Sequence, residues 1–189
     1  MTDAPTLLRA GKVRDIYRWQ EETWLVATDR ISAFDVILPQ PIPGKGTLLT
    51  SISRHWFETL PEARPHHVLG FDVPAGVPSP EIYAGRLTRC RTAQPLTVEC
   101  VVRGYLAGSA WDEYKKKGSA WGRTLPKYLI EAGLLPEPIF TPTTKAEQGH
   151  DLPLTDEAAE QQLGSSTFRQ VRERSLSLYN AARNRAEKA

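Results

Sequence analysis

The first part of the chain alternates polar and hydrophobic residues as β-strands do. Residues 13–18 alternate so that odd positions face one side of a strand and even positions the other. Residues 24–27 form a short apolar run that Thr28-Asp29-Arg30 ends. The polar residues 20–23 separate the two segments, so together they predict a β-hairpin.

A helical period follows this hairpin. Residues 48–60 place apolar side chains at helical spacing, and Pro61 would stop the helix. Residues 61–80 contain five prolines and are expected to be rich in loops. Two more strands are expected over residues 87–92 and 96–102.

The second half of the chain carries signals for helix ends. Ser109 is expected to cap a helix that has Asp112 in its first turn. The basic run 115–117 complements the C-terminal end of that helix, and Gly118 would end it. Residues 119–154 are expected to be irregular.

Two further helices are expected after residue 154. Thr155 is expected to cap a short helix that Gly164 closes. Thr167 and Gln170 have the spacing of a capping box, and a long amphipathic helix would follow. The predicted fold class is therefore α+β, with a β-rich N-terminal lobe over residues 1–95 and a more helical second lobe over 96–189.

Composition and charge narrow the class of protein. The chain has 189 residues, 40% of them hydrophobic and 24% charged, as in ordinary globular proteins. A net charge of +2 gives no reason to expect nucleic acid or a membrane as partner. Two cysteines do not make a disulfide framework, and no apolar run has the length of a signal peptide or membrane span. We expect a cytoplasmic protein.

Three segments carry residues that suit anionic ligands. Gly11-Lys12-Val13-Arg14-Asp15 puts a glycine and two cations at the start of a strand, which suits a phosphate but also a solvated edge strand. Glu99 to Ser109 leads from an apolar strand through Arg103 to a helix start, where a guanidinium, a hydroxyl and backbone N–H groups could meet a phosphate or carboxylate. The third segment, Thr143 to Asp151, clusters Lys, Glu, His and Asp.

Other motifs are weaker. Gly44-Lys45-Gly46-Thr47 lacks the spacing of a P-loop, because Gly46 separates Lys45 from Thr47. His66 and His67 are adjacent and would point apart in an extended chain, and His150 has no second ligand at useful spacing. The residues themselves therefore predict binding of anionic small molecules such as phosphates, and name no reaction.

Four segments in order closely resemble the phosphoribosylaminoimidazole-succinocarboxamide synthase (SAICAR synthetase) family. They are residues 11–17 (GKVRDIY), 28–35 (TDRISAFD), 99–109 (ECVVRGYLAGS) and 140–151 (FTPTTKAEQGHD). The resemblance implies a two-lobed α+β fold and an ATP-dependent ligase of purine biosynthesis. Such a ligase joins L-aspartate to the carboxylate of carboxyaminoimidazole ribonucleotide (CAIR) through an acyl phosphate, using ATP and Mg²⁺ and giving SAICAR, ADP and phosphate.

The resemblance also implies roles for individual residues. It places the cofactor ATP beside Gly11, Lys12, Val13, Arg14 and Glu99, and CAIR beside Arg103 and Ser109. It makes Asp35, Lys145 and Asp151 the catalytic residues. The N-terminal lobe would then bind ATP and the second lobe the substrate.

One departure from the family pattern leads to a further expectation. The family carries an Asp-x-Lys-x-Glu-Phe-Gly strand after the long helix, and this chain ends before it, at Ala189. We therefore expect a truncated chain whose Mg²⁺ ligands are missing, and no metal ligand is assigned. An inactive nucleotide-binding fragment, or a subunit that needs the missing part, remains the alternative to a ligase; a kinase-like phosphotransferase fits the third and fourth segments less well.

Overall fold

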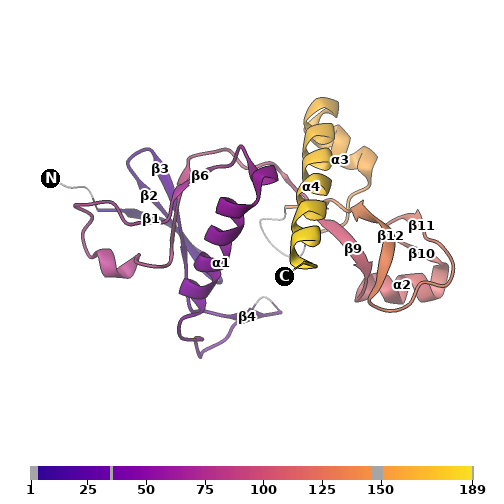
Figure 1. Cartoon of the computed structure of the whole chain (residues 1–189), viewed down its shortest axis with the longest axis horizontal. Helices are drawn as coiled ribbons and strands as arrows, with labels where there is room; N and C mark the ends of the chain where they lie inside the picture. The colour runs from indigo at the N-terminus through magenta and orange to yellow at the C-terminus, as the bar shows by residue number, and fades with distance from the viewer. Residues whose placement is uncertain (1–3, 35, 146–150, 189) are drawn as a thin grey trace. The chain divides into compact units, whose positions relative to one another are not determined.

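The computed structural model describes residues 4–34, 36–145 and 151–188. Its contacts divide the chain into two compact units, Met1–Gln94 and Pro95–Ala189. Figure 1 colours the chain from indigo in the first unit to yellow at the end of the second. Each unit is described by itself.

The first unit is built on an antiparallel sheet of five strands in the order β1-β2-β3-β7-β6. The strands are β1 (Thr6–Ala10), β2 (Arg14–Trp19), β3 (Glu22–Ala27), β7 (Leu87–Arg91) and β6 (Val68–Gly70). The predicted hairpin is confirmed, since β2 pairs with β3 from Arg14–Ala27 to Trp19–Glu22. Its turn is shorter than expected and consists of residues 20 and 21.

One face of this sheet carries the apolar core of the unit. Trp24, Val26 and Leu87 from the strands are buried there with Val77 and Tyr83. The rings of Trp24 and Tyr83 meet edge to face at 5.4 Å between centroids, a favourable aromatic geometry. In β3 the buried residues alternate along the apolar run that predicted the strand, because every second side chain of a strand faces the same side of the sheet.

Helix α1 (Lys45–Thr59) packs against strand β3 in this unit. The helix begins three residues earlier than predicted because the Asp29 carboxylate accepts hydrogen bonds from the N–H groups of Gly44 (3.1 Å) and Gly46 (2.8 Å). These two bonds also lower the pKa of Asp29. The helix ends at Thr59, as the proline at 61 predicted.

The remaining elements of the first unit are short. Strands β4 (Ser32–Ala33) and β5 (Val36–Ile37) pair with each other. Two single-turn 3₁₀ helices, η1 (Pro61–Ala63) and η2 (Pro80–Ile82), begin at prolines. The expectation of a loop-rich segment over 61–80 is correct apart from η1 and β6.

The second unit contains three pairs of antiparallel strands. They are β8 (Val98–Glu99) with β13 (Thr143–Thr144), β9 (Val102–Leu106) with β12 (Gly133–Phe140), and β10 (Ser119–Ala120) with β11 (Arg123–Thr124). The single strand expected over 96–102 is therefore wrong, because it is divided into β8 and a β9 that continues to Leu106. The expectation of an irregular segment over 119–154 is also wrong, since it contains four strands.

Three helices complete this unit: α2 (Ser109–Lys117), α3 (Asp156–Leu163) and α4 (Ser165–Ala186). The predicted ends at Gly118 and Gly164 and the Thr155 cap are confirmed, with Thr155 Oγ1 accepting from the Ala158 N–H at 3.1 Å. The predicted capping box at Thr167 is wrong, because α4 already begins at Ser165 after Gly164.

The second unit has two apolar clusters. One joins β9, α2 and β12 through Leu106, Ala110, Leu135 and their neighbours. The other joins β8 and β12 to the last two helices through Val98, Phe140, Ala159 and Phe168. No helix in the described part of the chain is long and apolar enough to cross a membrane.

Candidate functional site

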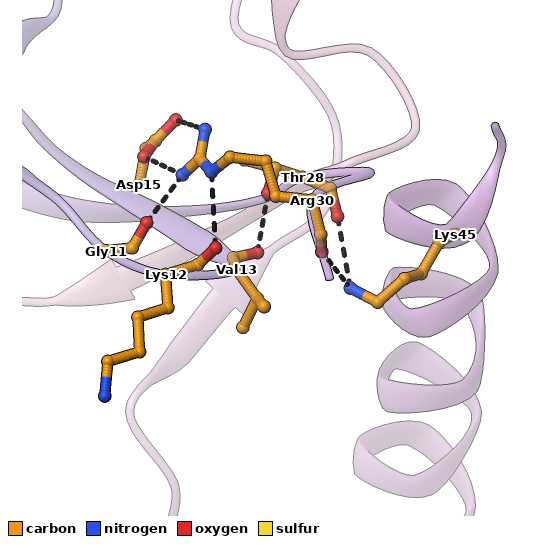
Figure 2. A network of polar contacts seen from close by, with 7 residues as sticks. All are labelled: Gly11, Lys12, Val13, Asp15, Thr28, Arg30 and Lys45. Atoms are coloured by element: carbon orange, nitrogen blue, oxygen red, sulfur yellow. Dashed lines mark hydrogen bonds and ion pairs between the residues drawn. The ribbon is translucent and has the colours of Figure 1, made fainter. Parts of the chain in front are cut away.

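The turn from Gly11 to Arg14 is closed by its own backbone, because the Gly11 N–H donates to the Arg14 carbonyl at 2.8 Å. A Cβ on residue 11 would lie 2.5 Å from that same oxygen, so the turn requires glycine. Figure 2 shows that the carbonyls of Gly11 and Lys12 face the guanidinium of Arg30 and that the Lys12 side chain extends away from it.

A cavity of about 190 Å³ lies in the first unit beside this turn. Two of the predicted nucleotide-binding residues, Val13 and Arg14, line it. Its other lining residues come from β3, α1, the segment before β6, and β7: Leu25, Ala27, Leu49, Thr50, Ser53, Phe57, His67 and Thr88. Sequence analysis missed these residues, because only the packing of the helix on the sheet brings them together.

The guanidinium of Arg14 gives this cavity a positive charge. Arg14 and His67 are the charged or titratable residues that line it, and the lining includes no carboxylate. Burial, His66 and the charge of Arg14 lower the pKa of His67. An anion bound beside Arg14 would therefore oppose part of that shift.

The glycine-rich segment before α1 has a structural role. Lys45 Nζ donates to the carbonyl oxygens of Arg30 (2.9 Å) and Thr28 (3.3 Å). Gly44 precedes the helix with φ of +81°, which favours glycine. This segment is therefore a tight turn before a helix and not a P-loop, in agreement with its spacing.

A larger cavity of about 700 Å³ lies within the second unit. Both predicted substrate-binding residues, Arg103 and Ser109, line it. Residues 140–143 of the fourth resembling segment also line it. Its remaining lining residues are Ala110, Glu113, Trp121, Gly122, Arg123, Pro153, Leu154, Thr155, Asp156 and Glu157.

Arg103 and Ser109 reach this cavity differently from what we expected. Arg103 lies within strand β9 rather than in a loop, and its guanidinium carbon is 5.6 Å from the centroid of the Trp121 ring. Ser109 is the first residue of α2 and does not cap it, because Gly108 precedes the helix with φ of +61°. The Ser109 hydroxyl makes no capping bond, so it is not committed to its own helix.

Two arginine side chains lie near the carboxylate of Asp156 at the start of α3. Arg123 Nη2 is 2.7 Å from Asp156 Oδ2, and Arg172 Nε of α4 is 3.9 Å from the same oxygen. Neither arginine was selected from the sequence, since residues 123, 156 and 172 are far apart along the chain. The lining of the cavity therefore includes both Arg103 and the Arg123–Asp156 ion pair.

Two predicted residues with different roles form an ion pair. Lys145 Nζ lies 3.5 Å from Glu99 Oε1, and both side chains are about half exposed. Pairing of β8 with β13 brings them together, since Thr143 lies opposite Glu99. Asp151 is exposed just after the undescribed segment 146–150, and the predicted catalytic residue Asp35 lies outside the described residues.

Mg²⁺ prefers carboxylate oxygens as protein ligands. Among the residues that the structure describes, no three His, Cys, Asp or Glu side chains lie close enough to hold a metal ion. The carboxylate of Glu99 faces the Lys145 ammonium instead. These residues do not fit a magnesium site, and we derive no step through one.

These features define an α+β protein of two units, each with its own candidate ligand cavity. The model of the SAICAR synthetase family matches residues 7–189, so the chain belongs to this family. The resemblance drawn from the four segments and the α+β fold class are confirmed.

Curated relatives agree with this assignment. The chain is 49% identical over 186 residues to a phosphoribosylaminoimidazole-succinocarboxamide synthase of Thermodesulfovibrio yellowstonii, covering 96% of this chain and 64% of the relative. It is 46% identical over 185 residues to one of Desulfosudis oleivorans, covering 94% and 63%. The chain thus spans about 64% of the length of its relatives.

Solved structures show the same fold. The Saccharomyces cerevisiae SAICAR synthase, determined in complex with SAICAR, superposes with a TM-score of 0.86 at 36% identity over 97% of this chain and 64% of that one. A type-2 SAICAR synthetase in complex with ADP superposes with a TM-score of 0.72 at 21% identity over 95% and 68%. The second likeness shows the fold alone.

Proposed function

We propose that the protein takes part in the ATP-dependent joining of L-aspartate to the carboxylate of CAIR, which gives SAICAR, ADP and phosphate. The observation that carries this proposal is the cavity of the second unit, where Arg103 and Ser109 lie together in a chain that belongs to the SAICAR synthetase family. The yeast relative at 36% identity was determined with SAICAR bound. We propose a cytoplasmic location for this activity.

In the proposed substrate site, Arg103 and the start of α2 take the anionic groups of CAIR. A guanidinium binds phosphate or carboxylate through two donors, and the first N–H groups of a helix add a favourable dipole. The hydroxyl of Ser109, which makes no capping bond, supplies a further hydrogen-bond donor at the start of α2. Trp121 beside Arg103 offers a flat apolar surface against the ligand.

In the proposed nucleotide site, the Gly11–Arg14 turn and its cavity take the phosphates of ATP. Arg14 supplies positive charge there, and Val13 lies close enough for backbone contact. Lys12 belongs to the same proposed site, and Glu99 of the second unit remains a proposed nucleotide-binding residue. Glu99 also forms the ion pair with Lys145, a proposed catalytic residue.

The proposed reaction has two steps. An oxygen of the CAIR carboxylate attacks the terminal phosphorus of ATP, and ADP leaves. The amine of aspartate then attacks the acyl phosphate carbon, loses a proton and expels phosphate. Lys145 would neutralise charge on the transferred group, and Asp35 and Asp151 are the other proposed catalytic residues; positioning and charge neutralisation supply most of the catalysis in such transfers.

A second proposal follows from the length comparison. Because the chain spans about 64% of its relatives, it could bind nucleotide and CAIR but need a further polypeptide for chemistry. The two proposals differ in the activity of the chain by itself, and not in its binding of ligands.

The test uses the full 189-residue chain with ATP, Mg²⁺, CAIR and L-aspartate, and follows SAICAR and ADP by chromatography. We expect negligible turnover by the chain alone, and turnover when the C-terminal third of the Thermodesulfovibrio yellowstonii relative is added as a separate polypeptide. The complete relative is the positive control. Turnover near that of the complete relative by the chain alone would support a self-sufficient ligase, and failure of calorimetry to detect CAIR binding would refute both proposals.

A further inference from the structure

The carbonyl groups of the Gly11–Arg14 turn all point towards hydrogen-bond donors. Two of these carbonyls are held by a single side chain, that of Arg30, through its Nη2 and Nε atoms. Arg30 Nη2 donates to Gly11 O at 2.8 Å and Arg30 Nε donates to Lys12 O at 3.3 Å. Val13 O accepts from Thr28 Oγ1 at 2.9 Å and from Thr28 N at 3.1 Å. Arg14 O accepts from Gly11 N at 2.8 Å. The shape of the turn therefore depends on donors from outside it.

The charge of Arg30 is already balanced. Its Nη2 and Nη1 atoms lie 2.5 and 3.3 Å from the two carboxylate oxygens of Asp15, and the Asp15 side chain is 15% exposed. Figure 2 shows the guanidinium with Asp15 on one side and the backbone of Gly11 and Lys12 on the other. Because these partners occupy the guanidinium, Arg30 is placed to hold the turn rather than to bind a ligand.

The three residues 28–30 connect the turn to helix α1. Thr28 binds the turn through Val13, and Asp29 accepts from the first N–H groups of the helix. Lys45 at the start of α1 donates back to the carbonyls of Thr28 and Arg30 (Figure 2). Arg30 is thus anchored at its backbone while its side chain holds the turn.

The other side of the turn presents donors. Val13 and Arg14 line the adjacent cavity. Within the described part of the chain, neither the Val13 N–H nor the Arg14 guanidinium has a hydrogen-bond or ion-pair partner. The carbonyls of the turn are thus already paired, two of them with Arg30, and these donors remain for an anion, as in backbone sites that bind phosphate.

We propose that Arg30 is the positioning residue of the nucleotide-binding turn, holding it so that the Val13 N–H and the Arg14 side chain are presented to phosphate before the ligand arrives. This inference rests on the proposed nucleotide site. Preorganisation of this kind raises affinity because the turn loses little freedom on binding. A lysine cannot replace Arg30, since one ammonium does not reach two carbonyls and a carboxylate in the fork geometry of a guanidinium.

The test compares Arg30→Lys and Arg30→Gln with the full wild-type chain. Arg54→Lys is the matched control, because Arg54 forms an exposed ion pair with Glu58 on α1 in the same unit. Calorimetry measures the affinities for ADP and for CAIR, and amide hydrogen exchange without ligand measures protection of residues 11–14. For both Arg30 variants we expect ADP affinity to fall at least tenfold, CAIR affinity to stay within twofold, and the turn to exchange at least tenfold faster.

Each other outcome counts against the proposal. Unchanged exchange at residues 11–14 would show that Arg30 does not hold the turn. Equal loss of ADP and CAIR affinity would indicate a general folding defect, and full ADP affinity in Arg30→Lys would show that charge alone suffices. If the wild type binds no ADP, the proposed nucleotide site fails, while the exchange data still decide whether Arg30 holds the turn.

Discussion

The ring of Tyr179 in helix α4 lies against the backbone of Gly104 in strand β9, in the space that a side chain at position 104 would need. A Cβ there would collide with the Tyr179 hydroxyl and with ring carbon Cζ at 2.8 Å. Gly104 is itself buried. The close approach of strand and helix therefore depends on glycine, beside the Arg103 that lines the larger cavity.

We expect Gly104→Ala to lower the free energy of unfolding by about 1–3 kcal/mol, because a packed core accommodates an extra methyl group poorly. Urea denaturation measures the change. Gly70→Ala is the control, since a Cβ at Gly70 would meet only Arg89 Nη1 at 3.9 Å. Tyr179→Phe added to Gly104→Ala should recover part of the loss; no loss in the single variant would contradict the contact.

Two residues expected to be helix caps should behave differently on substitution. Thr155→Ala should destabilise the protein by about 1 kcal/mol, because it removes an observed capping bond. Ser109→Ala should leave the free energy of unfolding within about 0.5 kcal/mol, since Ser109 caps nothing. Under the proposed function, Ser109→Ala should instead weaken CAIR binding; denaturation together with calorimetry separates these effects, and equal destabilisation would contradict the distinction.

Trp121 should act on CAIR binding through Arg103. The ring lies 5.6 Å from the guanidinium carbon, and such contacts contribute about 0.5–2 kcal/mol. We therefore expect Trp121→Leu to weaken CAIR binding roughly 2- to 30-fold and Arg103→Ala to weaken it more, with ADP affinity unchanged in both.

A double-mutant cycle by calorimetry checks this coupling. Once Arg103 is replaced by Ala, the further change Trp121→Leu should have little effect on CAIR binding. Lys115→Ala is the control, because its contact with Trp111 at 5.4 Å is also a cation–ring contact but its side chain is half exposed on α2. Strictly additive losses would show that Trp121 does not work through Arg103.

The acid stability of the first unit should depend on Glu22. Hydrogen bonds from Arg89 and, to a smaller degree, from Trp24 lower the pKa of Glu22 below its usual 4.5, although burial opposes them. A lowered folded pKa means that the ionised carboxylate stabilises the fold above about pH 4.5, and that this contribution disappears as pH falls through the folded pKa.

Glu22→Gln should therefore reduce stability at pH 7 and give a shallower decline between about pH 5 and 3. Urea denaturation at several pH values measures both effects. Glu58→Gln removes an exposed carboxylate, 54% exposed and paired with Arg54, and should leave the acid decline nearly unchanged. Parallel curves for wild type and Glu22→Gln would contradict the assigned role.

Local signals in the sequence were good predictors of element ends. Pro61, Gly118 and Thr155 act on backbone groups within one helical turn, and the structure confirms all three. Strand β12 was missed because Gly133–Phe140 contains Pro136 and Pro138, which lack the N–H that a ladder needs. It forms nevertheless, with a register shift between Leu134 and Ile139 where the prolines lie.

The residues of the candidate sites were likewise predicted only in part from the sequence. Residue chemistry selected Arg103 and Ser109 for one anion site and Lys12 and Arg14 for another, and the structure brings Arg103 and Ser109 to one cavity. Residue chemistry could not select Trp121, because only tertiary packing brings the turn between β10 and β11 to Arg103. Nor did it reveal that Glu99 and Lys145, 46 residues apart, would pair.

The sequence by itself determined the fold class, several helix ends and membership of the SAICAR synthetase family, because these follow from backbone preferences and from ordered segments of the chain. The tertiary structure alone decided the surroundings of each functional side chain. It placed Arg30 beneath the Gly11–Arg14 turn and Asp156 beside Arg123. Such contacts join residues many positions apart, so they arise from the packing of whole elements, which no local pattern encodes.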